Sequence, residues 1–238
     1  MYKRQDNVVN DSDLAVDKGN FFVELGSVVS KLAEGMLASL AIFVLTLVFS
    51  LPLGLLLMFV RLSKVNVIRW IAKIYISIMR GTPLMLQLLV VFFGPYYVFG
   101  ISLSYSYRFY AVIIGFALNY AAYFAEIYRS GIESIPKGQY EAAALLGYSK
   151  GQTFFKIVLP QVVKIVLPSV TNEVITLVKD TSLVYSLSYI EMFAVAKQIA
   201  ASQTTVVPFF IAGVFYYIFN YAVAWGMELL EKKLDYYR

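Results

Sequence analysis

The sequence predicts an all-α membrane protein that crosses the bilayer several times, and three observations lead to this prediction. Of the 238 residues, 60% are hydrophobic and 16% are aromatic, more than the core of a soluble domain requires. The apolar residues gather in segments long enough to cross a hydrocarbon core of roughly 30 Å. Most charges lie between these segments. The chain has no histidine or cysteine, which excludes disulfides, thiolate or imidazole metal sites, and Ser-His or Cys-His catalysis.

The first 35 residues are polar and acidic, and they lack the apolar stretch that a cleaved signal peptide needs. The first predicted span follows them and covers about 36–60. Pro52 and Gly54 lie within this span. They predict a kink, because proline removes a helical hydrogen bond.

Gly81, Thr82 and Pro83 predict a break between two helices. Thr82 is a suitable N-cap and Pro83 is tolerated in a first turn, so a second span is expected over about 83–99. Such a break can also act as the hinge of a gate. The amphipathic segment before it, 69–80, is expected to form a helix at the cytoplasmic membrane interface. The polar face of this segment comprises Arg69, Lys73, Ser77 and Arg80.

The remaining apolar segments predict three further spans, over about 110–128, 162–180 and 206–230. Residues 181–205 are too polar for a simple span and too apolar for an open loop, so we expect a short helix there, buried in protein or at the outer interface. Five spans place the two chain ends on opposite sides. Because lysine and arginine cluster on one side, the N-terminus is expected outside and the C-terminus in the cytoplasm. The net charge of +5 then reflects basic cytoplasmic loops and predicts no binding of nucleic acid.

The polar loop between the third and fourth spans, about 136–160, is the most informative part of the sequence. Residues 141–146 are strong helix formers that follow Pro136. Gly147 stands where a helix ends in the left-handed conformation. Ser149 can then cap a second helix, so the loop is predicted to form a helix, a bend and a helix outside the membrane. Such a unit is suited to docking into a groove of another protein.

The same loop resembles the EAA loop of ABC importer permeases at every defined position: Glu-Ala-Ala, three residues, Gly, nine residues, Ile, one residue and Leu-Pro. Three further stretches, 80–87, 125–132 and 177–183, are similar to permeases of the polar amino-acid uptake family. The resemblance covers about 37–234 and leaves out the acidic N-terminal extension. By this resemblance the ATPase-docking residues are Glu141, Ala142, Ala143, Leu145, Gly147 and Tyr148.

The resemblance implies a type I ABC importer fold with five transmembrane helices, in which 36–235 form the permease domain and 1–35 an external segment. Two permease subunits would enclose the path for an amino acid within the lipid of a bacterial cytoplasmic (inner) membrane. An extracellular or periplasmic solute-binding protein would deliver the amino acid. Two cytoplasmic ATPase subunits would bind ATP and Mg and move the EAA loop. The chain has no P-loop, so we expect no cofactor in it and no ATP hydrolysis by it alone.

Glu173 is the first candidate for contact with substrate. It lies twelve residues beyond Gln161, or roughly 18 Å along a helix, which is close to the bilayer midplane. An ionisable residue at that depth needs a function or a partner. Glu173 could instead pair with Lys179 or with another subunit, and Lys179 with Asp180 could stabilise a broken helix. The candidate residues of the substrate pathway are Asn119, Tyr120, Glu173, Lys179, Asp180 and Glu191.

Two other functions fit parts of the sequence. An ion-coupled secondary amino-acid carrier could use the same buried charges as coupling sites. Alternatively, the chain could be the structural half of a heterodimeric permease whose partner makes the substrate contacts. For Glu126 and Arg129, a solvated ion pair at the interface is a simpler interpretation than a role in transport.

Overall fold

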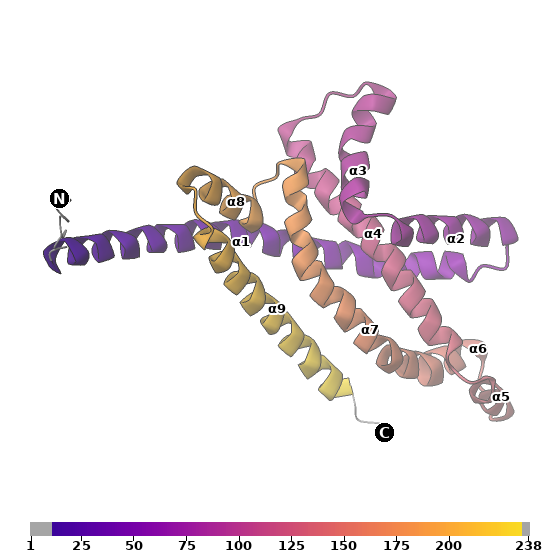
Figure 1. Ribbon diagram of the computed structural model, residues 1–238. Coiled ribbons are helices and arrows are strands. Elements are labelled where there is room, and N and C mark those ends of the chain that lie inside the picture. Colours follow the sequence, from indigo (N-terminus) through magenta and orange to yellow (C-terminus); the bar gives the residue numbers. More distant parts are fainter. Residues whose placement is uncertain (1–10, 235–238) are drawn as a thin grey trace, which may run out of the picture.

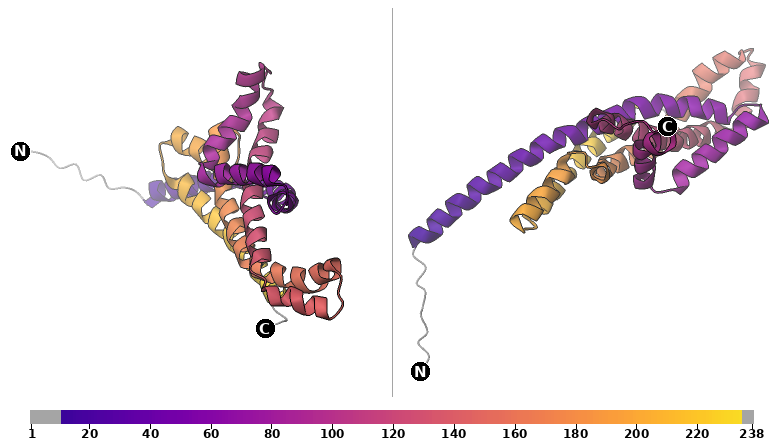
Figure 2. Two further views of the ribbon diagram at one scale, coloured as in Figure 1. Left: turned by 90° about the vertical axis from the view of Figure 1, so that its right-hand side faces the viewer. Right: turned by 90° about the horizontal axis from the view of Figure 1, so that it is seen from above.

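The computed structural model describes residues 11–234, and within this range the protein is helical with no strands. Three long helices, α4 (Tyr105–Glu133), α7 (Leu159–Asp180) and α9 (Val207–Leu234), form a bundle in which α7 packs against both of the others (Figure 1). The helix α1 (Asp11–Arg61) runs across this bundle (Figure 2). Of the expected external segment 1–35, residues 1–10 lie outside the described range.

The contact between α1 and α4 is the most extensive in the fold, and a glycine allows it. A Cβ atom on Gly54 would lie 2.8 Å from the Cβ of Phe124 and 3.1 Å from the carbonyl oxygen of Ala121. Only a glycine lets the two backbones approach so closely. Pro52 lies two residues earlier, and α1 continues through it as one helix. The two helices therefore form a tightly packed unit.

The helices α2 (Asn66–Gly81) and α3 (Leu84–Phe99) meet at an angle of 113°. The hydroxyl of Tyr75 in α2 donates a 2.8 Å hydrogen bond to the carbonyl of Leu118, in the middle of α4. The helix expected over 69–80 is present as α2, and it packs against the middle of α4. Ala72 and Ile76, which border its polar face, are buried against the bundle, while Ile71, Ile74 and Ile78 on its apolar face are exposed.

The break between α2 and α3 is stabilised differently from the prediction. Pro83, not Thr82, is the N-cap of α3. The Thr82 hydroxyl instead donates to the carbonyl of Ile78 at 2.8 Å. The side-chain amide of Gln87 donates to the carbonyl oxygens of Met79 at 2.9 Å and Thr82 at 3.1 Å, so carbonyls freed by the break have partners.

The loop 136–160 folds as predicted up to its second helix. The helix α5 (Lys137–Leu145) ends before Gly147, which is left-handed with φ +77°. Ser149 caps α6 (Lys150–Thr153) in a capping box. A π-helix, Phe154–Val158, then leads directly into α7, which has Pro160 in its first turn. The wider π turn accommodates the proline ring, which would clash with the carbonyl four residues earlier in a regular helix.

The segment 181–205 contains a 3-10 helix, Thr181–Leu187, and the short helix α8 (Met192–Gln203). Met192, Ala196 and Ala200 of α8 are buried, and α8 packs against α1 and α9. A short helix buried in protein was expected in this segment, and it is confirmed.

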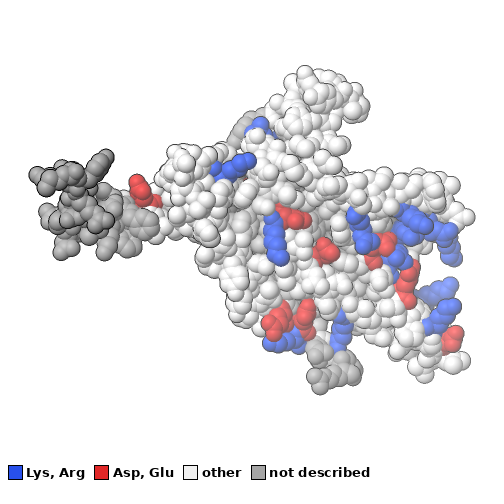
Figure 3. All heavy atoms as spheres, in the orientation of Figure 1, with Lys and Arg blue, Asp and Glu red and all other residues white. Residues whose placement is uncertain are grey.

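Four helical segments among the described residues are long and apolar enough to cross a membrane. The expected span 83–99 corresponds to α3, whose 16 residues are too few to qualify alone. It qualifies only together with α2, as one broken span. Figure 3 shows that most charges on this face lie over the half of the molecule that contains the α1–α2 turn, α5 and the end of α9.

Candidate functional site

A polar cluster lies where the end of α2 meets the middle of α4 and the second half of α7. The hydroxyl of Tyr120, which is 2% exposed, donates a 2.7 Å hydrogen bond to Asp180. The guanidinium of Arg80 lies over the ring of Tyr123, 5.4 Å from its centre. Glu173 is within electrostatic reach of both Arg80 and Asp180. The structure thus brings together three of the predicted residues and adds Arg80 and Tyr123.

This cluster, here called the central cluster (Arg80, Tyr120, Tyr123, Glu173 and Asp180), carries groups of both signs. Glu173 is half-buried and Arg80 is exposed, so both remain accessible to a ligand. A carboxylate attracts an ammonium group, and a guanidinium binds a carboxylate through two parallel hydrogen bonds. The arrangement is suited to a small molecule that carries both charges.

One face of α7 beside the cluster is polar and exposed. Its residues Ser169, Asn172, Thr176 and Lys179 follow one another at spacings of three or four, which is one side of a helix. Hydrocarbon would penalise such a face, so it requires water or protein against it. No ion pair joins Lys179 to Glu173 in the described part of the chain.

Asn119 does not face an open cavity. Its side chain is 4% exposed, and its amide donates to the carbonyl of Met79 at 3.1 Å and to Oε1 of Gln87 at 2.9 Å. These contacts hold the break between α2 and α3 against α4. Sequence spacing did not reveal this role, because the partners lie 32 and 40 residues away.

Glu191 is fully buried and forms the N-terminal cap of α8. Its carboxylate accepts hydrogen bonds of 2.8 Å from the backbone N–H groups of Phe193 and Ala194, and of 3.2 Å from the hydroxyls of Ser39 and Tyr216. Glu191 lies between the membrane-spanning segments, where burial raises the pKa of its carboxyl and the N–H groups oppose this change. It therefore joins α1, α8 and α9, and it is not exposed to a substrate path.

The loop 136–160, here called the docking loop after the role predicted for it, presents an apolar tip. Leu145 is 90% exposed and Leu146 is 75% exposed, while Tyr148 is partly exposed beside them. Ala143 is only 1% exposed, which removes it from the predicted docking face. The sequence did not distinguish it from Ala142, because consecutive alanines give no pattern of inside and outside. Leu146 was not predicted as a docking residue, because the sequence does not show which of two adjacent leucines is exposed.

Both ends of this loop are fixed to the bundle. Ile135, Val158 and Val162 form a buried cluster with Val166 between the end of α4 and the start of α7. A Cβ atom on Gly131 of α4 would lie 2.2 Å from Cγ1 of Val166. The two helices are in close contact where the loop begins and ends.

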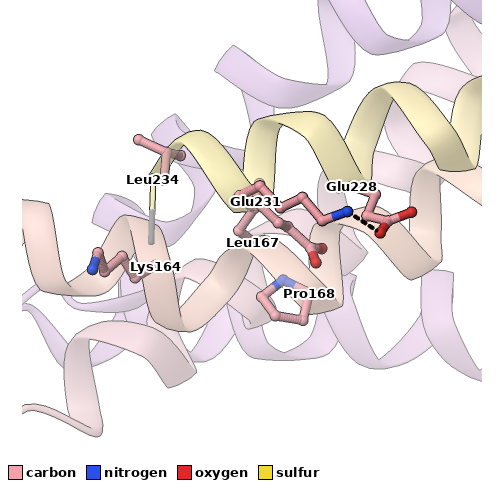
Figure 4. Close-up of a pocket in the computed structure, with 7 residues that line it drawn as sticks. Lys164, Leu167, Pro168, Glu228, Glu231 and Leu234 are labelled. Carbon is pink, nitrogen blue, oxygen red and sulfur yellow. Dashed lines mark ion pairs between the residues drawn. The ribbon is translucent and has the colours of Figure 1, made fainter. Parts of the chain in front are cut away.

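A separate cavity of about 400 Å³ lies between α7 and the end of α9 (Figure 4). Lys232 and Glu228 form an ion pair of 2.7 Å in its wall. Glu231 accepts a 2.7 Å hydrogen bond from Thr171. The cavity shares no residue with the central cluster. We assign it no part in the candidate site.

The spanning helices, the outward polar face of α7 and the fixed docking loop together define a multi-pass membrane subunit of a transport complex. The chain belongs to the family described as binding-protein-dependent transport system inner membrane component, whose model matches residues 50–236. The resemblance noted in the sequence is thereby confirmed.

Curated relatives agree with this assignment. The L-cystine transport system permease protein TcyB of Bacillus subtilis is 34% identical over 208 residues, which are 87% of this chain and 87% of the relative. The arginine transport system permease protein ArtQ of the same organism is 37% identical over 202 residues, covering 84% and 91%. Both are named as permeases, and each matches this chain over most of its length.

Solved structures confirm the predicted type I ABC importer permease fold. An amino acid ABC transporter solved with histidines matches with a TM-score of 0.81 and 27% identity, covering 89% of this chain and 98% of the other. The MetNI methionine ABC transporter in an inward-facing conformation matches with a TM-score of 0.66 and 18% identity, covering 87% and 95%. This second likeness concerns the fold alone.

Proposed function

We propose that this chain is a transmembrane subunit of an ATP-driven amino-acid importer in a bacterial cytoplasmic membrane. The exposed polar face of α7 beside the central cluster is the observation that carries the proposal. This face requires a partner, which a second permease subunit, the same chain or a homologous one, provides. The names of the relatives, which refer to cystine and arginine, support an amino acid as the transported solute.

The orientation follows from the charges. The α1–α2 turn, the docking loop and the end of α9 lie toward one end of the molecule (Figure 1). These segments carry Arg61, Lys64, Lys137, Lys150, Lys156, Lys232 and Lys233, so we assign this end to the cytoplasm. The N-terminus is then external, where a solute-binding protein delivers the amino acid.

The docking loop couples the permease to a cytoplasmic ATPase, which binds ATP and Mg. Leu145 and Leu146 are the apolar anchors for a groove of the ATPase, since exposed leucines on a short helix suit this mode of binding. Glu141 adds a charge for a basic partner, and Gly147 sets the bend. Because the loop is fixed to α4 and α7, its movement changes the position of both helices.

The central cluster selects the solute. The carboxylate of Glu173 attracts the ammonium group of an amino acid, and the guanidinium of Arg80 binds its carboxylate. Tyr120 holds Asp180 in place, and Lys179 lies on the same exposed face of α7. The break at 81–83 lies directly beside this cluster and serves as the gate.

Copurification tests the proposed assembly. The tagged chain, extracted from its own membrane in mild detergent, should retain an ATPase subunit and a second permease subunit. The associated solute-binding protein should bind free L-amino acids when it is titrated by calorimetry. Purification of the chain alone, together with uptake driven by an ion gradient in vesicles without any ATPase, would support the secondary carrier instead.

A further inference from the structure

The carboxylate of Glu126 in α4 lies between two guanidinium groups that belong to different helices. Arg129 of α4 donates to it from Nε at 3.1 Å and from Nη2 at 2.7 Å. Arg61, the last residue of α1, brings its Nε to 3.6 Å from Oε1 of Glu126. The side chains of Glu126, Arg61 and Arg129 are 17%, 19% and 23% exposed. Solvent therefore screens their charges less than it screens a fully exposed ion pair.

Glu126 and Arg129 occupy the last turns of α4 before the docking loop. Arg129 also forms an ion pair with Glu133, the last residue of α4, and α5 begins at Lys137. Another face of the same turns is fixed against α7, where Gly131 lies too close to Val166 for any side chain. The end of α4 is therefore held by packing on one face and by charges on another.

Arg61 stands at the turn that leads from α1 into α2. Residues 62–65 alone separate the two helices. From there α2 leads to Arg80 in the central cluster and to the helix break at 81–83. The contact between Glu126 and Arg61 thus lies on a continuous physical route from the docking loop to the proposed gate.

We propose that Glu126 is a positioning residue for transport, which transmits movement of the docking loop through Arg61 to the α1–α2 turn and the gate. This inference rests on the proposed function. It assigns a role to a group that the sequence alone presents as a solvated ion pair. An ion pair suits this role, because two opposite charges that solvent screens only partly resist separation of the helix ends that carry them; Nε of Arg61 makes no hydrogen bond to Glu126.

The test measures how many amino-acid molecules enter proteoliposomes per ATP hydrolysed by the complete complex. Glu126→Gln and Arg61→Gln should each lower this ratio roughly fivefold or more, the scale of typical coupling between sites. The double variant should lower it no further, because both changes remove the same contact. Arg61→Lys, which retains the positive charge, should recover part of the ratio.

Glu133→Gln is the matched control, since it removes a carboxylate from Arg129 and leaves the link to α1 intact. It should keep the ratio of the unmodified complex. An unchanged ratio in Glu126→Gln, additive losses in the double variant, or an equal loss in Glu133→Gln would overturn the inference. If Glu126→Gln does not assemble, equal ratios for Arg61→Gln and Arg61→Lys overturn it. Absence of ATP-dependent uptake by the unmodified complex would instead overturn the proposed function.

Discussion

The phenol of Tyr120 and the carboxylate of Asp180 form a 2.7 Å hydrogen bond that joins the middle of α4 to the last residue of α7. Asp180 lies at the junction with the 3-10 helix Thr181–Leu187, and Tyr120 is almost fully buried. The bond fixes the position of a carboxylate beside Glu173. It therefore determines the shape of the central cluster.

Tyr120→Phe should destabilise the protein and weaken uptake. The change leaves the Asp180 carboxylate without its hydroxyl donor, which costs about 1–3 kcal/mol for a buried acceptor. The thermal midpoint of the purified complex and the KM for uptake are the measurements. Tyr123→Phe is the control, because its ring still lies under the guanidinium of Arg80. Equal changes in thermal midpoint and KM in the two variants would contradict a role for the Tyr120–Asp180 hydrogen bond.

Glu173→Gln should raise the KM for the amino acid with little change in the thermal midpoint. The substitution keeps the shape of the side chain and removes the charge that attracts the ammonium group, an interaction of about 1.5–3 kcal/mol. Saturation curves for uptake measure this. Glu231→Gln is the control, since Glu231 is bonded to Thr171 outside the central cluster. An unchanged KM in Glu173→Gln would favour a structural half of a heterodimer.

Gly147→Val should uncouple ATP hydrolysis from uptake while membrane insertion remains normal. The space around the Cβ position is open, so the effect comes from the φ of +77°, a conformation that costs a β-branched residue about 1–3 kcal/mol. The measurement is uptake per ATP at equal amounts of inserted protein. Gly151→Ala, in α6 with open space and ordinary backbone, should behave as the unmodified protein. Normal coupling in Gly147→Val would exclude a role for the bend.

Leu145→Ala should weaken the binding of the ATPase by about fivefold or more, because truncation of an apolar anchor at the centre of an interface costs about 1 kcal/mol or more. Leu145 is almost completely exposed, so the fold of the chain should not change. Binding of the purified ATPase to permease in nanodiscs measures the affinity. Val67→Ala, at another exposed apolar residue, on α2, is the control. If Val67→Ala weakens ATPase binding and Leu145→Ala does not, the ATPase does not bind at Leu145.

Local features of the fold could be predicted from the sequence. The bend at Gly147 and the cap at Ser149 depend on conformational preferences of residues within one turn, and both are present. The EAA spacing identified the family for the same reason, since it is a local pattern. The short helix in 181–205 was also expected from its mixed composition.

Contacts between distant segments could not be predicted. Arg80 meets Tyr123, and Arg61 meets Glu126, only because α2 folds back along α4 and α1 ends beside it. The burial of Glu191 likewise depends on α1 and α9, which both contact it at the start of α8. A single sequence contains charges and spacings, whereas these roles arise from packing between elements.

Uptake by proteoliposomes tests the central claim most directly. Vesicles containing this chain with its partner permease and ATPase subunits are loaded with ATP and supplied with the binding protein and a labelled amino acid. We predict accumulation that requires ATP inside, persists with an ionophore, and is lost when the ATPase subunits are left out. Accumulation that needs an ion gradient and proceeds without the ATPase would contradict the account.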